Sequence, residues 1–314
     1  MAEMPMREYY GRALADYGAV NPAVVVLDAD TSSSTLSQFF GQRFPERFFN
    51  LGIAEPCLVD VAVGLALEGR IPFANAFAAL IALRAAEQVR TCIAYAEANV
   101  KLAAGYAGVS DFKDGPTHHA ITDLAIMRAL PNMTVIVPAD GCEAAAWVPV
   151  IAEHPGPVYL RLSRAAPRPV HAAPPAVAIG RGFTLRPGRD ATIIACGAMT
   201  GRSLQAVEQL AAEGLDVRLI EMPSLKPLDE DLVRQAAAET GAIVTAEEHS
   251  LIGGLGGAVA EALGVAAPVP LVRVGIRDTF ARTGPSEEAI MDAYGLGVGD
   301  LVAAVKQVLR YKRG

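Results

Sequence analysis

The stretch AVVVLDADTSSST, residues 23–35, indicates the fold class of this 314-residue chain. An unbroken apolar run ends in acids and hydroxyls, the pattern of a strand buried on both faces and followed by a polar loop. Further strand-like runs occupy 98–109 (ANVKLAAGYAGV), 133–140 (MTVIVPAD) and 158–163 (VYLRLS), and an Ala/Leu-rich helical stretch occupies 79–96. Alternation of strand and helix predicts an α/β fold on a parallel, doubly wound sheet.

A segment rich in proline, alanine and glycine divides the chain. It reads AAPRPVHAAPPAVAIGRG over residues 165–182, a composition typical of a linker. Beyond it, DATIIACGAM, DVRLIEMP and AIVTAEEH supply three more strands with helices between them. We therefore expect two doubly wound α/β domains, at 1–168 and 188–314, joined by a linker at 169–187.

The composition excludes several classes of protein. Hydrophobic residues make up 52% and charged residues 19%, as in a well-packed globular protein. A net charge of −7 without any basic block argues against a nucleic-acid partner. The apolar runs are too interrupted to span a membrane, and MAEMPMREYY lacks the apolar core of a signal peptide. We expect a cytoplasmic protein whose four cysteines are reduced core thiols: Cys57, Cys92, Cys142 and Cys196.

Ligands of open α/β sheets bind beyond the carboxyl ends of the strands, so the loops after strands are the candidate site. The loops with chemistry-bearing side chains are 28–35, 108–119 and 162–167. They offer Asp28 and Asp30 with a group of hydroxyls, a sequence GVSDFKDGPTHH, and Arg164. Hydroxyls also cap helices, and Asp-Gly and Gly-Pro also form turns. Three such loops at strand ends nevertheless suggest one composite site.

Metal and phosphate-loop motifs are not recognised in the sequence. His118 and His119 are adjacent, so their side chains diverge, and we find no further ligand at a recognised spacing. The glycine-rich run HSLIGGLGGAVAEAL, residues 249–263, lacks the lysine of a phosphate loop and does not fit GxGxxG with an acidic partner. We expect no metal ligands in this chain, and we interpret the run as a tight turn that allows close helix packing.

A lone acid, Glu55, stands in the apolar run NLGIAEPCLVD, residues 50–60. One interpretation is structural: Pro56 suits the first helical position, and an acid there favours the positive end of the helix dipole. The other is functional: a carboxyl group held in a dry pocket exchanges a proton with a ligand. These eleven residues alone leave both open.

Four longer segments show a resemblance to a known family. They are LGIAEP (51–56), DGPTHHAITDLAIMRALPNMTVIVPAD (114–140), AEEHSLIGGLGGAVAEAL (246–263) and VGIRDTFARTG (274–284). In this order and spacing they resemble the C-terminal half of transketolase, above all the separately encoded C-terminal subunit of split transketolases. The resemblance implies a thiamine diphosphate pyrimidine-binding domain followed by a transketolase C-terminal domain.

The resemblance also implies roles for individual residues. Glu55 would hydrogen-bond the N1′ atom of the cofactor's aminopyrimidine and favour the imino tautomer that removes the thiazolium proton. Because a residue before proline is steered away from helical geometry, Glu55 is expected in a loop, with Leu51, Ile53 and Cys57 keeping water away.

The donor-binding and cofactor-binding residues follow from the same motifs. The histidine that bonds donor oxygens matches His118, and the acid that contacts the donor's C2 hydroxyl matches Asp114. Arg7, Ser34 and Arg164 match residues that hold the sugar phosphate, where guanidinium groups suit phosphate oxygens. Phe77 matches an aromatic residue beside the pyrimidine, and Asp30 is placed with the cofactor.

Two positions depart from the family pattern. A second aromatic ring usually follows three residues after Phe77, and this sequence has Leu80 there, which implies weaker cofactor affinity. A histidine that helps to bind the donor phosphate is replaced by Tyr106. Lys113 either restores the missing positive charge or is simply solvated. The altered loop implies an unusual donor.

The family's GDG…N motif, which holds Mg²⁺ and the diphosphate, does not occur in this sequence. The resemblance therefore implies half an active site: a separate diphosphate-binding subunit would complete it, in an α2β2 heterotetramer with thiamine diphosphate and Mg²⁺ at the interfaces. The expected reaction transfers a two-carbon ketol unit from a ketose phosphate to an aldose.

Three alternatives remain. The β subunit of a 2-oxo acid dehydrogenase E1 component has the same domain order, but its loop reads Gly-His-His-Ser-Gln where this chain has DGPTHHAITD. The C-terminal part of deoxyxylulose phosphate synthase normally belongs to one continuous chain. A non-catalytic stabilising subunit has no need of the combination Glu55, Asp114 and His118.

Overall fold

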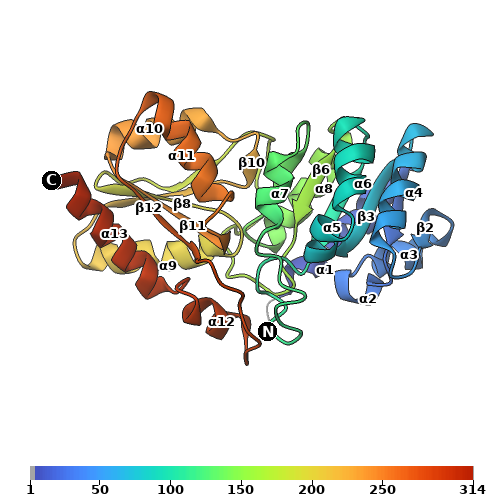
Figure 1. Cartoon of the computed structure of the whole chain (residues 1–314), viewed down its shortest axis with the longest axis horizontal. Coiled ribbons are helices and arrows are strands. Elements are labelled where there is room, and N and C mark those ends of the chain that lie inside the picture. Colours follow the sequence, from blue (N-terminus) through green and yellow to red (C-terminus); the bar gives the residue numbers. More distant parts are fainter. Residues whose placement is uncertain (1–3, 314) are drawn as a thin grey trace.

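Two separate sheets, each with helices on both faces, form the two halves of the molecule (Figure 1). The computed structural model describes residues 4–313. The first sheet has the strand order β10-β5-β6-β4-β3-β1-β2, and the second has the order β12-β11-β8-β9-β7. All pairs are parallel except the edge pairs β10–β5 and β7–β9. The predicted α/β class is confirmed.

The first half contains the residues up to β6 together with one strand, β10, from later in the chain. Its strands are β1 (Val24–Asp28), β2 (Phe48–Asn50), β3 (Ile71–Phe77), β4 (Lys101–Gly105), β5 (Thr134–Ile136), β6 (Val158–Arg161) and β10 (Ser224–Lys226). Its helices are α1 (Met6–Val20), α2 (Ser32–Thr35), α3 (Gln38–Arg43), η1 (Pro45–Arg47), α4 (Glu55–Leu67), α5 (Ala78–Leu83), α6 (Ala86–Gln88), η2 (Val89–Tyr95), α7 (Asp123–Ala129) and α8 (Gly141–Glu153).

The second half is built in the same way around the shorter sheet. Its strands are β7 (Phe183–Arg186), β8 (Ala191–Ala195), β9 (Val217–Glu221), β11 (Ile243–Ser250) and β12 (Leu271–Ile276). Its helices are α9 (Met199–Ala212), α10 (Glu230–Thr240), α11 (Leu255–Ala266), α12 (Glu287–Ala293) and α13 (Val298–Arg313). Among the described residues, no helix is long and apolar enough to cross a membrane.

Strand β1 shows why an unbroken apolar run marks this fold. Successive side chains of a strand point to opposite faces, so a strand covered on both sides needs apolar residues throughout. Val24 and Val26 join the core under α1 and α8. Val25 and Leu27 join the core under α4 and α5. All five residues of β1 are buried.

Three sequence predictions need correction. The helical stretch 79–96 is divided into α5, α6 and a π-helix, η2, since the chain leaves helical geometry at Ala85. The expected linker 169–187 contains β7, which pairs with β9 as the edge of the second sheet. Three of the four cysteines are not core residues: Cys57 is exposed, and only Cys196 is fully buried. All four are free thiols, as predicted.

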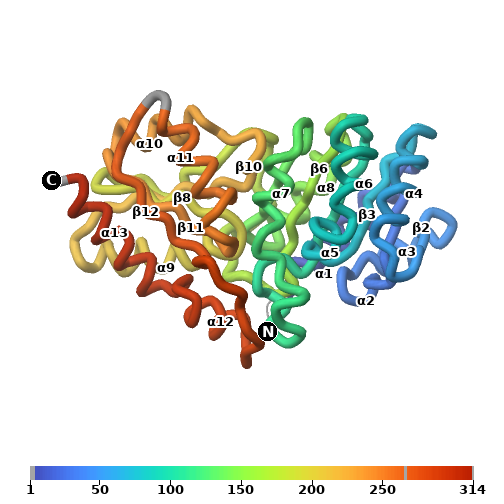
Figure 2. The backbone as a smooth tube through the Cα atoms, viewed as in Figure 1, coloured from blue at the N-terminus to red at the C-terminus, as the bar shows by residue number. Residues whose placement is uncertain are grey.

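The two halves are held together by segments that cross between them. Strand β10 leaves the second half and pairs with β5 of the first sheet. The loop after β4 also reaches across: in Figure 2 it lies beside the stretch that leads from β12 to α12, and the Gly284 backbone N–H donates to the Phe112 carbonyl at 3.0 Å. This places the loop 108–119 between the halves.

Candidate functional site

The carboxyl ends of β1, β3, β4 and β6 meet at one edge of the first sheet, because these strands are neighbours and parallel. Tyr106, directly after β4, is the centre of a group of side chains there. The Phe77 ring stacks on it with centroids 4.4 Å apart. The Arg164 and Arg7 guanidinium carbons lie 4.9 Å and 5.8 Å from its ring centroid.

Arg7 is held at this edge by two hydrogen bonds. Its Nη1 donates to the Tyr106 hydroxyl at 3.0 Å and to the Ser34 carbonyl at 2.7 Å. Its Nε is buried and has no hydrogen-bond partner. Ser34 therefore contributes its backbone carbonyl to the position of Arg7, whereas the sequence resemblance predicts that Ser34 contacts the sugar phosphate. A half-buried guanidinium with a free donor suits an anionic ligand.

The backbone at this edge is strained in a way that the sequence does not show. Tyr106 has φ 59° and Asp30 has φ 63°, both in the left-handed region. A bulky aromatic residue rarely adopts this conformation, and such strain clusters at functional sites. At Tyr106 it turns the chain sharply at the end of β4.

The loop 108–119 brings Asp111, Asp114 and His118 to the same site. Arg164 forms an ion pair with buried Asp111. Burial and the neighbouring Asp114 raise the pKa of Asp111 against the opposing charge of Arg164. The His118 ring meets Phe77 edge-on with centroids 5.7 Å apart, and His118 Nδ1 lies 3.0 Å from the Thr117 hydroxyl. His119 turns away to the Asp111 carbonyl, so the two histidines diverge as predicted.

Glu55 is fully buried, yet only one of its oxygens has a partner. Arg84 Nη1 donates to Oε2 at 2.8 Å, and Oε1 has no hydrogen-bond partner. An orphaned buried carboxylate oxygen is costly, so such an oxygen marks a place where a ligand donor fits.

The prediction that Glu55 lies in a loop is wrong. It is the first residue of α4, since the Leu58 N–H already bonds the Ala54 carbonyl at 2.9 Å. The bias before proline is a preference, and it is outweighed once the helix begins with Pro56 in its first turn. Of the residues expected to cover it, Leu51 is partly buried, but Ile53 is 72% exposed and Cys57 is exposed, so other parts of the chain bury Glu55.

The other predicted residues are more scattered. Asp28 is buried and ties the loop 28–35 together by accepting from Thr31, Thr35 and Ser37. Exposed Asp30 pairs with the Asn50 side chain at 3.0 Å. Leu80, in α5, is half-buried. Exposed Lys113 has its Nζ 5.7 Å from the Phe112 ring centroid.

The glycine-rich run forms a tight turn, as predicted, and its helix end is already filled. Both Glu247 oxygens accept N–H groups at the start of α11, from Leu255 at 2.7 Å and Gly256 at 2.8 Å. A Cβ atom on Gly254 would lie 1.8 Å from Glu247 Oε2. The carboxylate occupies the place that a phosphate would take in a phosphate loop.

Arg84 and Asp111 are site residues that the sequence reasoning missed. Arg84 lies 29 residues from Glu55, and Asp111 lies 53 residues from Arg164. The signal for Asp111 was its place in the loop 108–119. No local spacing indicates Arg84, because its direction depends on the break between α5 and α6, where the Arg84 and Ala85 N–H groups share the Leu80 carbonyl.

We expect Arg84→Met to destabilise the protein by about 1–2 kcal/mol, because it leaves the buried Glu55 carboxylate unpaired. We expect a cost near the lower end of this range, because the Arg84 side chain is 47% exposed and its charge is partly screened by solvent. In a Glu55→Gln background the same substitution should cost almost nothing. Urea unfolding of the four proteins in this double-mutant cycle measures the coupling, and equal costs in both backgrounds would contradict the pairing.

A pyrimidine-binding domain of the thiamine diphosphate enzymes is the class that these features define: a doubly wound sheet, a buried carboxylate with a free oxygen, and aromatic and cationic groups at the strand ends. Residues 2–169 match the transketolase pyrimidine-binding domain, and residues 180–301 match the transketolase C-terminal domain. The chain belongs to the transketolase family, and it is an enzyme subunit of the split type.

Similar proteins support this assignment. The 6-deoxy-6-sulfo-D-fructose transketolase subunit SqwH of Clostridium sp. (strain MSTE9) is 38% identical over 98% of this chain and 95% of its own length. One of the subunits of an apulose-4-phosphate transketolase from Phocaeicola vulgatus is 35% identical over 92% of this chain and 93% of its own. A solved split gene transketolase, described as an inactive beta4 tetramer, is 49% identical with TM-score 0.91, over 99% of this chain and 100% of that chain.

Proposed function

We propose that Glu55 binds the aminopyrimidine of thiamine diphosphate through its free Oε1. Phe77, Leu80 and Asp30 would lie around the cofactor. The observation that carries this is the fully buried carboxylate with one oxygen unsatisfied. When bound, the cofactor supplies the nucleophilic carbon that accepts the ketol unit. Glu55 holds or releases a proton at the ring nitrogen, and its burial keeps water from competing.

The donor is a ketose that ends in an anionic group. Arg7, Arg164 and the Tyr106 hydroxyl would hold that group, because two guanidinium groups flank Tyr106 and the Arg7 Nε is free. The names of the two relatives refer to a sulfonated sugar and a phosphorylated sugar. Either terminal group accepts hydrogen bonds from guanidinium. His118 and Asp114 would contact the donor's oxygens, and Lys113 stays solvated.

We expect Arg7→Met to raise the KM for a phosphorylated or sulfonated donor about 10–100-fold with little change in kcat, because a charge-assisted hydrogen bond contributes about 1.5–3 kcal/mol of binding. The KM for a donor without the anionic group should not change. Arg12→Met is the matched control, since Arg12 is exposed and its contacts are with Glu8 on the same helix and with the Phe39 ring, whose centroid is 5.2 Å from its guanidinium carbon. Equal effects on charged and neutral donors would contradict the assignment.

A separate diphosphate-binding subunit completes the site and supplies the Mg²⁺ contacts. Glu55 opens α4, and exposed apolar side chains lie on this helix, just before it, and on its neighbours α5 and η2. We call this the α4 face; its residues are Ile53, Cys57, Val61, Leu67, Leu83 and Tyr95. Exposed apolar side chains beside an orphaned carboxylate suit a protein partner. Two copies of each chain, α2β2, form the proposed assembly.

Calorimetric titration with thiamine diphosphate and Mg²⁺ tests the function. The isolated chain should bind weakly or not at all and should be inactive, and mixing with the diphosphate-binding subunit should restore both cofactor binding and ketol transfer. Tight binding of the cofactor by the isolated chain would contradict the proposal that this chain holds only half of the active site.

The α4 face is tested with Ile53→Asp by size-exclusion chromatography of the mixed subunits and by the ketol-transfer assay. The variant should fold normally but should neither co-elute with the diphosphate-binding subunit nor restore activity. Tyr311→Asp is the control, because Tyr311 is 57% exposed on α13 in the other half of the molecule. Unchanged assembly of the Ile53 variant would place the partner elsewhere. Oligomers of the isolated chain that Ile53→Asp disperses would identify a second copy as the occupant when the partner is absent.

A further inference from the structure

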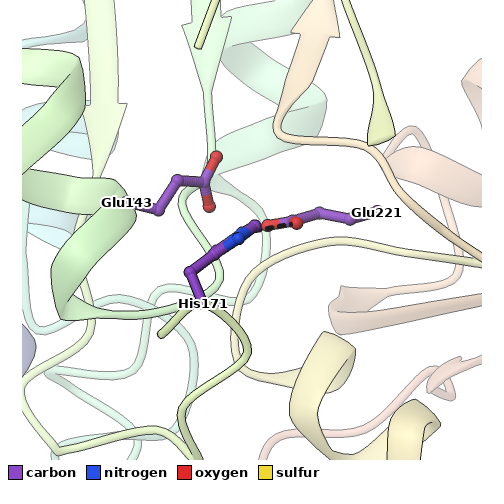
Figure 3. A group of neighbouring side chains, drawn as sticks. All are labelled: Glu143, His171 and Glu221. Atoms are coloured by element: carbon purple, nitrogen blue, oxygen red, sulfur yellow. Dashed lines mark hydrogen bonds and ion pairs between the residues drawn. The ribbon is translucent and has the colours of Figure 1, made fainter. Parts of the chain in front are cut away.

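Three side chains that the proposed reaction does not use meet where the two halves join. Glu143 comes from the first turn of α8, His171 from the segment before β7, and Glu221 from the last residue of β9 (Figure 3). One ligand atom from each lies within 4.8 Å of the other two. His171 Nε2 is 2.8 Å from Glu221 Oε2. The group is separate from Glu55 and the Tyr106 site.

Neighbouring groups hold the Glu143 side chain and the backbone of His171 in place. Glu143 Oε2 accepts the Ala139 N–H at 2.6 Å, and Oε1 accepts the Trp147 indole N–H at 2.9 Å. Asp140 Oδ2 accepts the His171 N–H at 2.8 Å and so fixes the chain that carries the imidazole. Contacts of this kind fix the orientation of side chains that surround a metal site.

Within the group, the His171 imidazole can balance only one of the two acids, and only when it is protonated. Glu143 and Glu221 are both fully buried, and Glu221 Oε1 has no hydrogen-bond partner. Figure 3 shows the Glu221 carboxylate pointing toward the imidazole. Within residues 4–313, the ion-pair partner of Glu221 is His171, and no lysine or arginine pairs with either glutamate. Two buried carboxylates are costly unless protons or a cation neutralise them.

We propose that Glu143, His171 and Glu221 bind one divalent transition-metal ion, with Zn²⁺ as the best-suited ion, at the junction of the two halves. An imidazole and two carboxylates are typical Zn²⁺ ligands, and the imidazole disfavours Mg²⁺ and Ca²⁺. A water molecule would take the fourth position. Zn²⁺ holds such ligands at about 2.0–2.2 Å, which places tetrahedral ligand atoms about 3.4 Å apart. The three ligand atoms lie within 4.8 Å of one another, so side-chain rotation has to bring them closer.

The proposed site has a structural consequence. Its ligands belong to α8, to the connecting segment and to β9, so a bound ion would tie both sheets and the segment between them together. A proton shared between Glu143 and Glu221 is the competing way to neutralise the acids, and it would leave the junction without a metal.

Equilibrium dialysis of the full-length chain, stripped with a chelator and then titrated with Zn²⁺, tests the site. We expect one Zn²⁺ per chain, an upward shift of the unfolding temperature, and an absorption band of tetrahedral Co²⁺ without thiolate character. Glu221→Gln and His171→Gln should each weaken Zn²⁺ binding by about 100-fold or more. Loss of a residue that merely supports a metal ligand typically costs about 10–100-fold in affinity, and loss of a ligand itself should cost at least as much.

Two control variants separate this site from adventitious binding. Cys57→Ser removes the exposed thiol, and His154→Gln removes a histidine at the far end of α8; both should retain the stoichiometric Zn²⁺. Absence of stoichiometric binding by the wild-type chain would overturn the proposal and leave the shared proton. Binding that survives both Glu221→Gln and His171→Gln, or that is lost in Cys57→Ser, would overturn it as well.

Discussion

Glu55→Gln should reduce kcat for ketol transfer by about 10²–10⁴-fold in the complex with the diphosphate-binding subunit. Glutamine has nearly the same shape, but it neither donates a carboxyl proton nor carries the charge that stabilises a protonated ring nitrogen. Because the change acts on proton transfer, the deuterium exchange rate of the bound cofactor's reactive carbon should fall along with kcat. Cofactor affinity should change far less.

The fold of the Glu55 variant has to be checked, since Arg84 loses its partner. Arg84 is about half exposed and remains solvated, so the unfolding midpoint should move little. Glu68→Gln is the matched control, because Glu68 is exposed at the other end of the same helix and should show wild-type rates. Full activity of the Glu55 variant in the complex would sink the catalytic role and favour a stabilising subunit.

Arg161→Met should destabilise the chain by about 3–5 kcal/mol, because it leaves Asp123 as an unpaired buried charge. Arg161 Nε donates to Asp123 Oδ2 at 2.7 Å, and their side chains are 4% and 1% exposed. Arg161 Nη2 also donates to the Glu248 carbonyl at 3.1 Å in the second half. The ion pair therefore contributes to the junction between the halves as well as to the first core.

Denaturant unfolding measures this cost, with Arg12→Met as the control for an exposed arginine. The control pair with Glu8 is on the surface, so its loss should cost about 0.5 kcal/mol or less. Asp123→Asn provides a second test, since it removes the charge but keeps the shape. A cost below about 1 kcal/mol for both buried variants would show that the pair is not what holds the junction.

The same pair predicts acid sensitivity. Burial opposes ionisation of Asp123, but Arg161, His249 and Tyr159 outweigh it and hold the pKa of Asp123 below its usual value. A depressed pKa gives stability that is present above the ordinary value of about 3.9 and is lost as the pH falls through the folded value. Below about pH 4, wild-type stability should therefore fall more steeply than that of Asp123→Asn.

Much of the site was predictable because parallel strands end at the same edge. The apolar runs predicted β1, β4, β5 and β6, and the polar residues after them predicted where a ligand binds. Tyr106 and Arg164 are 58 residues apart, yet their rings and charges meet because β4 and β6 are neighbours. Strand β3 carries a proline and an asparagine, Pro72 and Asn75, so its apolar signal is weaker.

The remaining contacts depend on where helices and connections turn. Arg84 reaches Glu55 only because the chain breaks between α5 and α6, and β10 joins the first sheet only after crossing from the second half. Neither event has a local pattern, since each depends on free energy gained by packing against distant segments.

The sequence by itself determined the class of fold, the strand-end loops and the family to which Glu55, Asp114 and His118 belong, because side-chain periodicity and turn chemistry are local. Only the tertiary structure decided which groups share a buried space. Glu143, His171 and Glu221 are separated by 28 and 50 residues, and these spacings do not indicate that the three side chains meet where the two halves join. Burial raises the cost of each unbalanced charge, so the environment supplied by folding, rather than the residue type, gives these acids their chemistry.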